Sequence, residues 1–340
     1  MKGRTEGDKM RVKPIEIKWH PGLPVFAKES FLKAVSDEYG WLGGFSELGE
    51  LRCALPYTIV QKAIFRMVRF RVETLPMTFD FGVSEEKVFL NSAIEFLRSI
   101  GVDMVIPATT NTLFRTYPDG ADVAPYGSYV IDLGQPEDIL WKNIDRITRQ
   151  NIRSASKAGI IIRDASVDEY DDAYLLIRDT FKRSKLPFMD QKSFSDFLSG
   201  LAENGKLLVA DQKGVAQSFC AFGYSDFSVY AVYAGNTIDQ PQGANKLLYW
   251  EAIRLFKSLS VRTYDFVGAR IGPEKGSKQE ALGLFKKRFG ATLKKGYIWK
   301  YSFHPLKYRL YRLAARLRSG GDIVDAEKHK MSSFKLPDEG

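Results

Sequence analysis

The sequence predicts a mixed α/β protein built from two domains. The chain has 340 residues, of which 44% are hydrophobic and 13% aromatic, and this is enough for two cores of ordinary size. Segments with helical and with strand periodicity alternate in two successive rounds, and the order of elements is similar in both. No apolar run approaches the length of a membrane span. Two domains of related topology are therefore the simplest interpretation.

The domain limits follow from where the pattern starts again. We expect a loose polar tail over residues 1–14, a first domain over 15–135, a second domain over 136–304 and a tail over 321–340. A helix over 305–320 is predicted to join the first domain. The amino-terminal segment has no apolar core of the kind found in signal peptides, so the sequence predicts a cytoplasmic protein.

The first round begins with a short helix over 28–40, which Gly40 ends. Strands are predicted over 49–60 and 67–77. A clear helix with Ser84 as its cap follows and ends at Gly101. It leads into strands over 103–109 and 128–133.

The second round has the same alternation. Ser166 opens an amphipathic helix with acidic residues in its first turn, and the remaining elements are read from periodicity. The predicted strands cover 159–166, 206–236, 262–269 and, as a final pair, 293–303. The predicted helices cover 166–184, 188–205, 243–260 and 279–290.

A positively charged helix is predicted over 137–159, between the two domains. Five cations recur in it at intervals of three or four residues, which places them on one face of an α-helix. They are Lys142, Arg146, Arg149, Arg153 and Lys157. The apolar residues on the opposite side are Trp141, Ile144, Ile147, Ile152, Ala155 and Ala158. The charged face is either a solvated surface or a binding surface for a phosphate-rich ligand.

The net charge of +9 is concentrated near the end of the chain. Residues 281–321 contain eleven Lys and Arg residues and no Asp or Glu. Such asymmetry points to nucleic acid, anionic lipid or a phosphorylated substrate. Two cysteines and three dispersed histidines support neither a disulfide framework nor a metal site nor a Ser-His-Asp triad.

Four patterns in order along the chain carry a family resemblance. They are Ile-Asp-Leu at 131–133 with the basic helix after it, GANKLLYWEAI at 243–253, YDFVGA at 264–269 and LGLFKKRFGA at 282–291. Together they resemble the FemABX family, whose members carry two tandem GNAT-like domains of mixed sheets flanked by helices. The chain lacks the long heptad insertion that forms a coiled-coil arm in some members.

The resemblance implies aminoacyl transfer. Family members move an amino acid from aminoacyl-tRNA to an amine of a nucleotide- or lipid-linked muropeptide, without a metal or cofactor. Lys286 matches the lysine of the family's Phe-Lys pattern, where it stabilises charge near the reacting ester, and Phe285 is assigned with it to the substrate site. Alone, Lys286 beside Lys287 and Arg288 also fits a solvated helix face.

Two further residues are candidates with alternatives. Asp265 at a strand end either positions or deprotonates the acceptor amine, or caps the turn after the strand. Tyr233 either lines a substrate cleft or belongs to the core. Both alternatives stay open at the level of sequence.

Two other functions compete with aminoacyl transfer. The first is an N-acyltransferase that uses acyl-CoA or an acyl carrier protein, with residues 240–245 at the position of a pyrophosphate loop. That segment has one glycine and no arginine, so it only weakly favours CoA. The second is a non-catalytic RNA-binding protein, for which the chain shows no module signature.

The helix predicted over 305–320 begins at Pro305 and ends at Gly320. Its leucine stripe is flanked by cations, and the residues are Leu306, Leu310, Leu313 and Leu317 with Lys307, Arg309, Arg312, Arg316 and Arg318. The helix either docks on the first domain through the leucines or contacts anionic lipid at the inner face of the membrane.

Overall fold

The computed structural model describes residues 10–319 and 321–333, without the side chains of 317–319 and 329–333, and divides the chain into two compact units. Unit 1 comprises the chain up to Lys18, Ser36–Gly127 and the chain from Lys295 on, and unit 2 comprises Trp19–Val35 and Ser128–Lys294. Residues 19–35, which the sequence assigned to the first domain, thus lie in unit 2. The predicted amino-terminal tail is too long, because Arg11–Ile15 form a strand.

Unit 1 contains a sheet with the strand order β1-β2-β3-β4-β6-β13, with β5 paired to β3. β6 runs parallel to β4 and antiparallel to β13. The strands are β1 (Arg11–Ile15), β2 (Glu38–Phe45), β3 (Leu51–Lys62), β4 (Phe65–Phe70), β5 (Leu75–Pro76), β6 (Met104–Val105) and β13 (Thr292–Ser302). The predicted final strand pair over 293–303 is the single strand β13.

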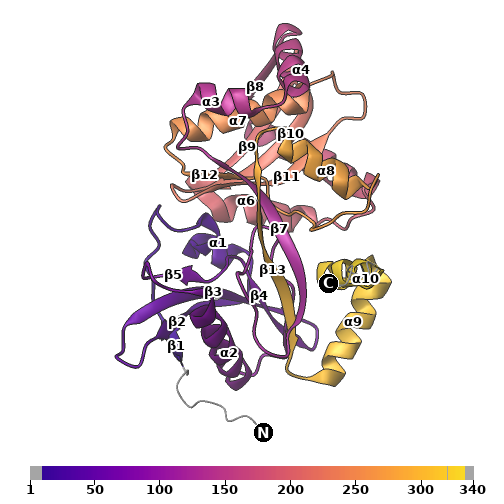
Figure 1. The fold of residues 1–340 in the computed structure, drawn as a ribbon. Coiled ribbons are helices and arrows are strands. Elements are labelled where there is room, and N and C mark those ends of the chain that lie inside the picture. Colours follow the sequence, from indigo (N-terminus) through magenta and orange to yellow (C-terminus); the bar gives the residue numbers. More distant parts are fainter. Residues whose placement is uncertain (1–9, 320, 334–340) are drawn as a thin grey trace, which may run out of the picture. The chain divides into compact units, whose positions relative to one another are not determined.

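Helices cover both faces of this sheet (Figure 1). Side chains alternate across a strand, so Val68 packs toward α2 (Val83–Ser99), whereas Met67 packs toward α9 (Pro305–Ser319). Gly82 rather than the predicted Ser84 precedes the first turn of α2. A further helix, α10 (Ile323–Ser333), lies in the segment expected to be a tail.

Unit 2 contains a sheet with the strand order β7-β12-β11-β10-β9-β8. β12 is parallel to β11 and antiparallel to β7, which makes the sheet mixed. The strands are β7 (Asp122–Asp132), β8 (Ile160–Asp164), β9 (Gly205–Gln212), β10 (Val215–Tyr224), β11 (Val229–Asn236) and β12 (Thr263–Asp265).

The two faces of this sheet have different cores. Leu208 and Ala210 of β9 face a core shared with α3 (Glu137–Asn143), α4 (Arg146–Lys157), α7 (Ala244–Ser258) and α8 (Lys278–Lys287). Leu207 and Val209 face α5 (Tyr170–Arg183) and α6 (Gln191–Leu201) on the other side. α1 (Glu29–Ala34) attaches to α6 through the Ser30 hydroxyl, which donates to the Gly200 carbonyl at 2.9 Å.

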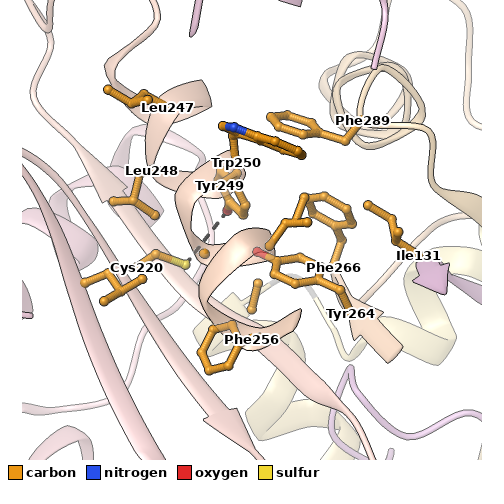
Figure 2. Packing of buried hydrophobic residues seen from close by; sticks show 14 of the residues in the cluster. Ile131, Cys220, Leu247, Leu248, Tyr249, Trp250, Phe256, Tyr264, Phe266 and Phe289 are labelled. Atoms are coloured by element: carbon orange, nitrogen blue, oxygen red, sulfur yellow. Dashed lines mark hydrogen bonds between the residues drawn. The ribbon is translucent and has the colours of Figure 1, made fainter. Parts of the chain in front are cut away.

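An aromatic cluster forms the first of these cores (Figure 2). Tyr249 and Trp250 of α7 face Phe266 and Phe289, and the Tyr249 and Phe266 rings are 5.5 Å apart. Such pairs stabilise beyond their buried area. The cluster holds the start of α7, the end of β12 and the end of α8 together, and these are the segments that carry the family patterns.

Among the described residues, no helix combines the length and apolar character that crossing a membrane requires. The same part of the chain contains no group of His, Cys, Asp and Glu side chains arranged for a metal ion.

Candidate functional site

The basic segment is two helices rather than one, so the prediction of a continuous helix over 137–159 is wrong. α3 ends at Asn143, and Ile144 has an extended ψ of 135°. Asp145 then caps α4, because its carboxylate accepts from the N–H groups of Ile147 at 2.9 Å and Thr148 at 3.1 Å. The prediction of one helix overlooked the strength of Asp145 as an N-cap.

The break changes the role of Arg149. Its Nη1 donates to the carbonyls of Trp141, Lys142 and Ile144, at 3.3, 2.7 and 2.5 Å. The Trp141 carbonyl also accepts from the Ile144 N–H at 3.3 Å, and Lys142 lies in the last turn of α3, where carbonyls run out of helical partners. Arg149 therefore joins α3 to α4, and its guanidinium is engaged with the protein backbone.

The remaining cations have different surroundings. Lys142 is exposed and pairs with Asp138 one turn earlier, at 2.9 Å. Arg146, Arg153 and Lys157 are exposed on α4, and no carboxylate of the described residues forms an ion pair with them. Their spacing of seven and four residues places these three on one face. We call them the α4 cations.

The opposite face of α4 packs on the core, and of the predicted apolar residues Ile144, Ile152 and Ala155 are buried, whereas Ile147 and Ala158 are exposed. Thr148 is buried as well, and Ile147 is 58% exposed. The break shifts the helix phase, so the buried stripe passes through Thr148. The Arg153 guanidinium also lies 5.4 Å from the Trp141 ring centroid, a distance suited to a cation–π contact.

α4 lies directly on the start of α7. Gly243 precedes α7 with a φ of +94°, and a Cβ there would be 2.3 Å from the Asn151 carbonyl oxygen. Only glycine permits this approach. A backbone carbonyl of α4 thus packs against Gly243, the residue that precedes α7.

The end of α8 lies at the α3–α4 break. The Asp145 N–H donates to the Arg288 carbonyl at 2.9 Å. A Cβ on Gly290 would be 2.7 Å from Asn143 Cβ. Arg288 is exposed, and burial together with the charge of Arg288 lowers the pKa of Lys246. Arg288 and Lys246 therefore add positive charge beside the α4 cations, and the sequence analysis did not assign either to the site.

The end of β12 forms a strained turn. The Asp265 carboxylate accepts from the Ser128 hydroxyl and from the Val267 N–H, the latter at 2.7 Å. Val267 has a φ of +42° and Gly268 a φ of +60°. A positive φ is costly for a β-branched residue and persists only where its surroundings enforce it. Of the two interpretations of Asp265, capping of this turn is the one that the hydrogen bonds show.

Lys286 of α8 reaches into this turn. Its Nζ donates to the carbonyls of Val267 and Gly268, both at 2.5 Å. Burial lowers the pKa of Lys286 to about 8, whereas the charge of Asp265 raises it. An ammonium group has three N–H donors, so two carbonyls leave one donor for a further acceptor.

The two aromatic candidates lie apart from each other. Phe285, the residue before Lys286, is half-buried beside Tyr249, with ring centroids 5.3 Å apart. Tyr233 lies on the other face of the sheet in an aromatic cluster with α5 and α6, where it packs 5.2 Å from Phe188. The structure thus groups Lys286, Asp265 and Phe285, and separates Tyr233 from them.

Sequence reasoning missed Ser128 and the turn residues Val267 and Gly268. Ser128 stands 137 positions before Asp265, and no local pattern connects the two. The glycine after Phe-Val was the only sequence indication of an unusual turn.

Comparisons with known proteins bear on the fold. Residues 114–213, which span β7, α3, α4, β8 and β9, match the model of the FemAB family. The structure named FemX is similar over 88% of this chain and 99% of that chain, with a TM-score of 0.65 and 12% identity. Over residues 114–213 the chain thus resembles the FemAB family. Its fold is that of tandem GNAT-like proteins.

A second solved structure has the same fold. L-PGS of Bacillus licheniformis is similar over 85% of this chain and 91% of that chain, with a TM-score of 0.50 and 11% identity. No curated protein matches the sequence.

Proposed function

We propose that this protein transfers an aminoacyl group from aminoacyl-tRNA to an amine of a peptidoglycan precursor. The observation that carries the proposal is the placement of Lys286, a cation with one N–H to spare, in the same unit as the unpaired α4 cations. The match of residues 114–213 to the FemAB family model supports the reaction class.

The chemistry suits a held ammonium group. The amine nitrogen attacks the ester carbonyl carbon and forms a C–N bond, and the carbonyl oxygen becomes an oxyanion. The C–O bond to the tRNA ribose then breaks, and the amine loses a proton while the ribose hydroxyl gains one. Lys286 donates its remaining N–H to the oxyanion, where a preorganised charge contributes most.

Asp265 acts through the turn rather than on the amine. Its carboxylate is buried, with 8% exposure, and it holds Val267 in place. Val267 and Gly268 in turn present the carbonyls that fix Lys286. We therefore assign Asp265 as a positioning residue.

The α4 cations bind the phosphates of the donor. Single-stranded nucleic acid is held by cationic surfaces with an affinity that falls with salt. The exposed Arg288 adds to this surface. Arg149 does not contribute, because its guanidinium is used between α3 and α4.

The arrangement disfavours the CoA alternative. A pyrophosphate is held by a glycine-rich loop before a helix start, and residues 240–245 contain one glycine, Gly243, against which α4 packs closely.

The direct experiment follows a radiolabelled amino acid from charged tRNA to a muropeptide. We expect transfer by the wild type and weaker tRNA binding by Arg146→Gln/Arg153→Gln, with the salt slope of log K reduced by about 0.7 for each cation removed. Lys182→Gln, an exposed cation on α5, is the matched control and should bind like the wild type. Salt-dependent tRNA binding without transfer would favour the non-catalytic alternative, and thermal stabilisation by CoA but not by tRNA would favour an acyl-CoA donor.

A further inference from the structure

Helix α9 docks on unit 1 with the face opposite to the one that its leucines predict. Tyr308 and Tyr311 pack against Met67, Met104 and Ile106 of the sheet, and the Tyr311 ring lies 6.2 Å from that of Phe65. The docking prediction named the leucines as the buried stripe, and in that respect it is wrong.

Ion pairs fix the helix in this orientation. Lys307 Nζ lies 2.7 Å from the buried Asp103 carboxylate, and Arg312 lies 3.7 Å from Asp325 of α10. Asp325 also pairs with the fully buried Lys300 at 2.7 Å. Rotating the leucines inward would break these contacts.

The leucines consequently point to the outside of unit 1. Leu306, Leu310 and Leu313 are 75%, 55% and 57% exposed. Their spacing of four and three residues makes them one continuous stripe along the helix. An amphipathic helix normally buries such a stripe, and a contiguous exposed apolar stripe marks an interaction surface. Leu317 and Arg318 of the predicted pattern lie outside the described side chains.

The charged residues beside the leucine stripe are all positive. Arg309 and Arg316 are exposed, and they lie next to the leucines on the helical wheel. No acidic residue occurs anywhere in α9. Within the described part of the chain, no carboxylate forms an ion pair with either arginine.

We propose that this face of α9 docks on an anionic lipid surface. Leucines on one side and arginines at their flank are the composition of a helix that lies in the membrane interface. Each arginine near such a surface contributes attraction, and the leucines supply the apolar burial that RNA binding does not need. A second copy of the chain would place the same arginines against each other. The inference is independent of the proposed reaction.

The test measures sedimentation of the full chain with vesicles. We expect binding to phosphatidylcholine vesicles that contain phosphatidylglycerol, and much less to phosphatidylcholine alone. Leu310→Gln/Leu313→Gln should weaken binding by at least about tenfold. Arg309→Gln/Arg316→Gln should weaken it by roughly 25-fold, at about fivefold for each arginine.

Matched controls test whether vesicle binding depends on the α9 face or on any exposed leucine or cation of unit 1. Leu48→Gln changes a leucine that is 91% exposed in the β2–β3 turn of the same unit, and Lys62→Gln changes an exposed cation on β3. Both should bind vesicles like the wild type, and all variants should melt like it. No vesicle binding by the wild type would overturn the proposal. Loss of vesicle binding in the arginine variant but not in the leucine variant would also overturn it, because it indicates a surface for anions such as RNA without apolar insertion. Dimers in light scattering that depend on the leucines would overturn it in favour of a second copy.

Discussion

Two buried lysines, one in each unit, have opposite surroundings. Lys300 of β13 in unit 1 is fully buried, and its Nζ lies 2.8 Å from Asp322 and 2.7 Å from Asp325. Burial alone would lower the pKa of Lys300, but these carboxylates raise it well above its usual value. Lys286 in unit 2 contacts two neutral carbonyls, and burial lowers its pKa to about 8.

The difference distinguishes a structural cation from one suited to chemistry. Around Lys300 the neighbouring carboxylates balance its positive charge, so the lysine exerts little electrostatic attraction on a ligand. Around Lys286 no carboxylate of the described residues forms an ion pair, and a strained turn fixes the ammonium. Burial lowers the pKa of Lys286 more than the charge of Asp265 raises it, and a pKa perturbed in this way is typical of functional sites.

Removing Lys300 should give the largest effect on stability. Lys300→Met leaves Asp322 and Asp325 without their buried partner, and breaking such a cluster costs about 3–5 kcal/mol. Denaturant unfolding measures the loss. We expect transfer activity per folded molecule to stay as in the wild type.

A companion variant tests the cause. Lys300→Met/Asp322→Asn/Asp325→Asn removes the stranded charges and should recover part of the free energy of unfolding. An equal loss in both variants would show that packing of the lysine stem, rather than charge balance, holds this region.

Removing Lys286 should act on the reaction and not on the fold. Lys286→Met eliminates the donor to the oxyanion, which costs about 100-fold to 1000-fold in kcat. Its unfolding free energy should remain close to that of the wild type, because the lost contacts are offset by relief from burying a charge. The transfer assay and denaturant unfolding are measured on the same preparation.

Lys287→Met is the matched control, since the neighbouring lysine on α8 is exposed. It should keep wild-type kcat. A Lys286→Met variant that turns over normally would remove Lys286 from the reaction and reduce it to a clamp on the turn.

Much of the fold follows from local pattern. The helical periodicity before Gly101 and the alternation of β9 and β10 identify elements that exist in the structure. Two features did not follow from the pattern. One continuous helix was predicted across Asp145, although an Asp at this position is a strong N-cap. The leucine stripe of α9 left docking and lipid contact both open, since periodicity does not say which face of a helix finds a partner.

The candidate site was predicted only in part, because its contacts are made by backbone groups and by residues distant in the chain. Lys286 and Asp265 came from the family patterns, but their connection runs through the backbone carbonyls of Val267 and Gly268. Backbone groups have no sequence signature, and Ser128 is distant in the chain. The same holds for Lys300, whose carboxylate partners come from the segment expected to be a tail.

The smallest expected effect is on the pH dependence of the unfolding free energy. This dependence should differ between the Lys286 and the Lys300 variants. The folded-state pKa of Lys286 is about 8 against an unfolded value of 10.5, so the unfolded chain binds more protons between these values and stability rises with pH there. The unfolding free energy of the wild type minus that of Lys286→Met should therefore increase from about pH 8 to about pH 10.

Lys300 has the opposite sign, because its folded-state pKa is raised. Its contribution is complete below the unfolded value and is lost only as the pH rises toward the folded one. The difference between the wild type and Lys300→Met should thus be flat over the window in which Lys286 gives a slope. Subtracting the unfolding free energy of each variant from that of the wild type cancels the titrations that both proteins share. Equal pH curves of this difference for the two lysines would mean that their surroundings do not differ in the way that the contacts indicate.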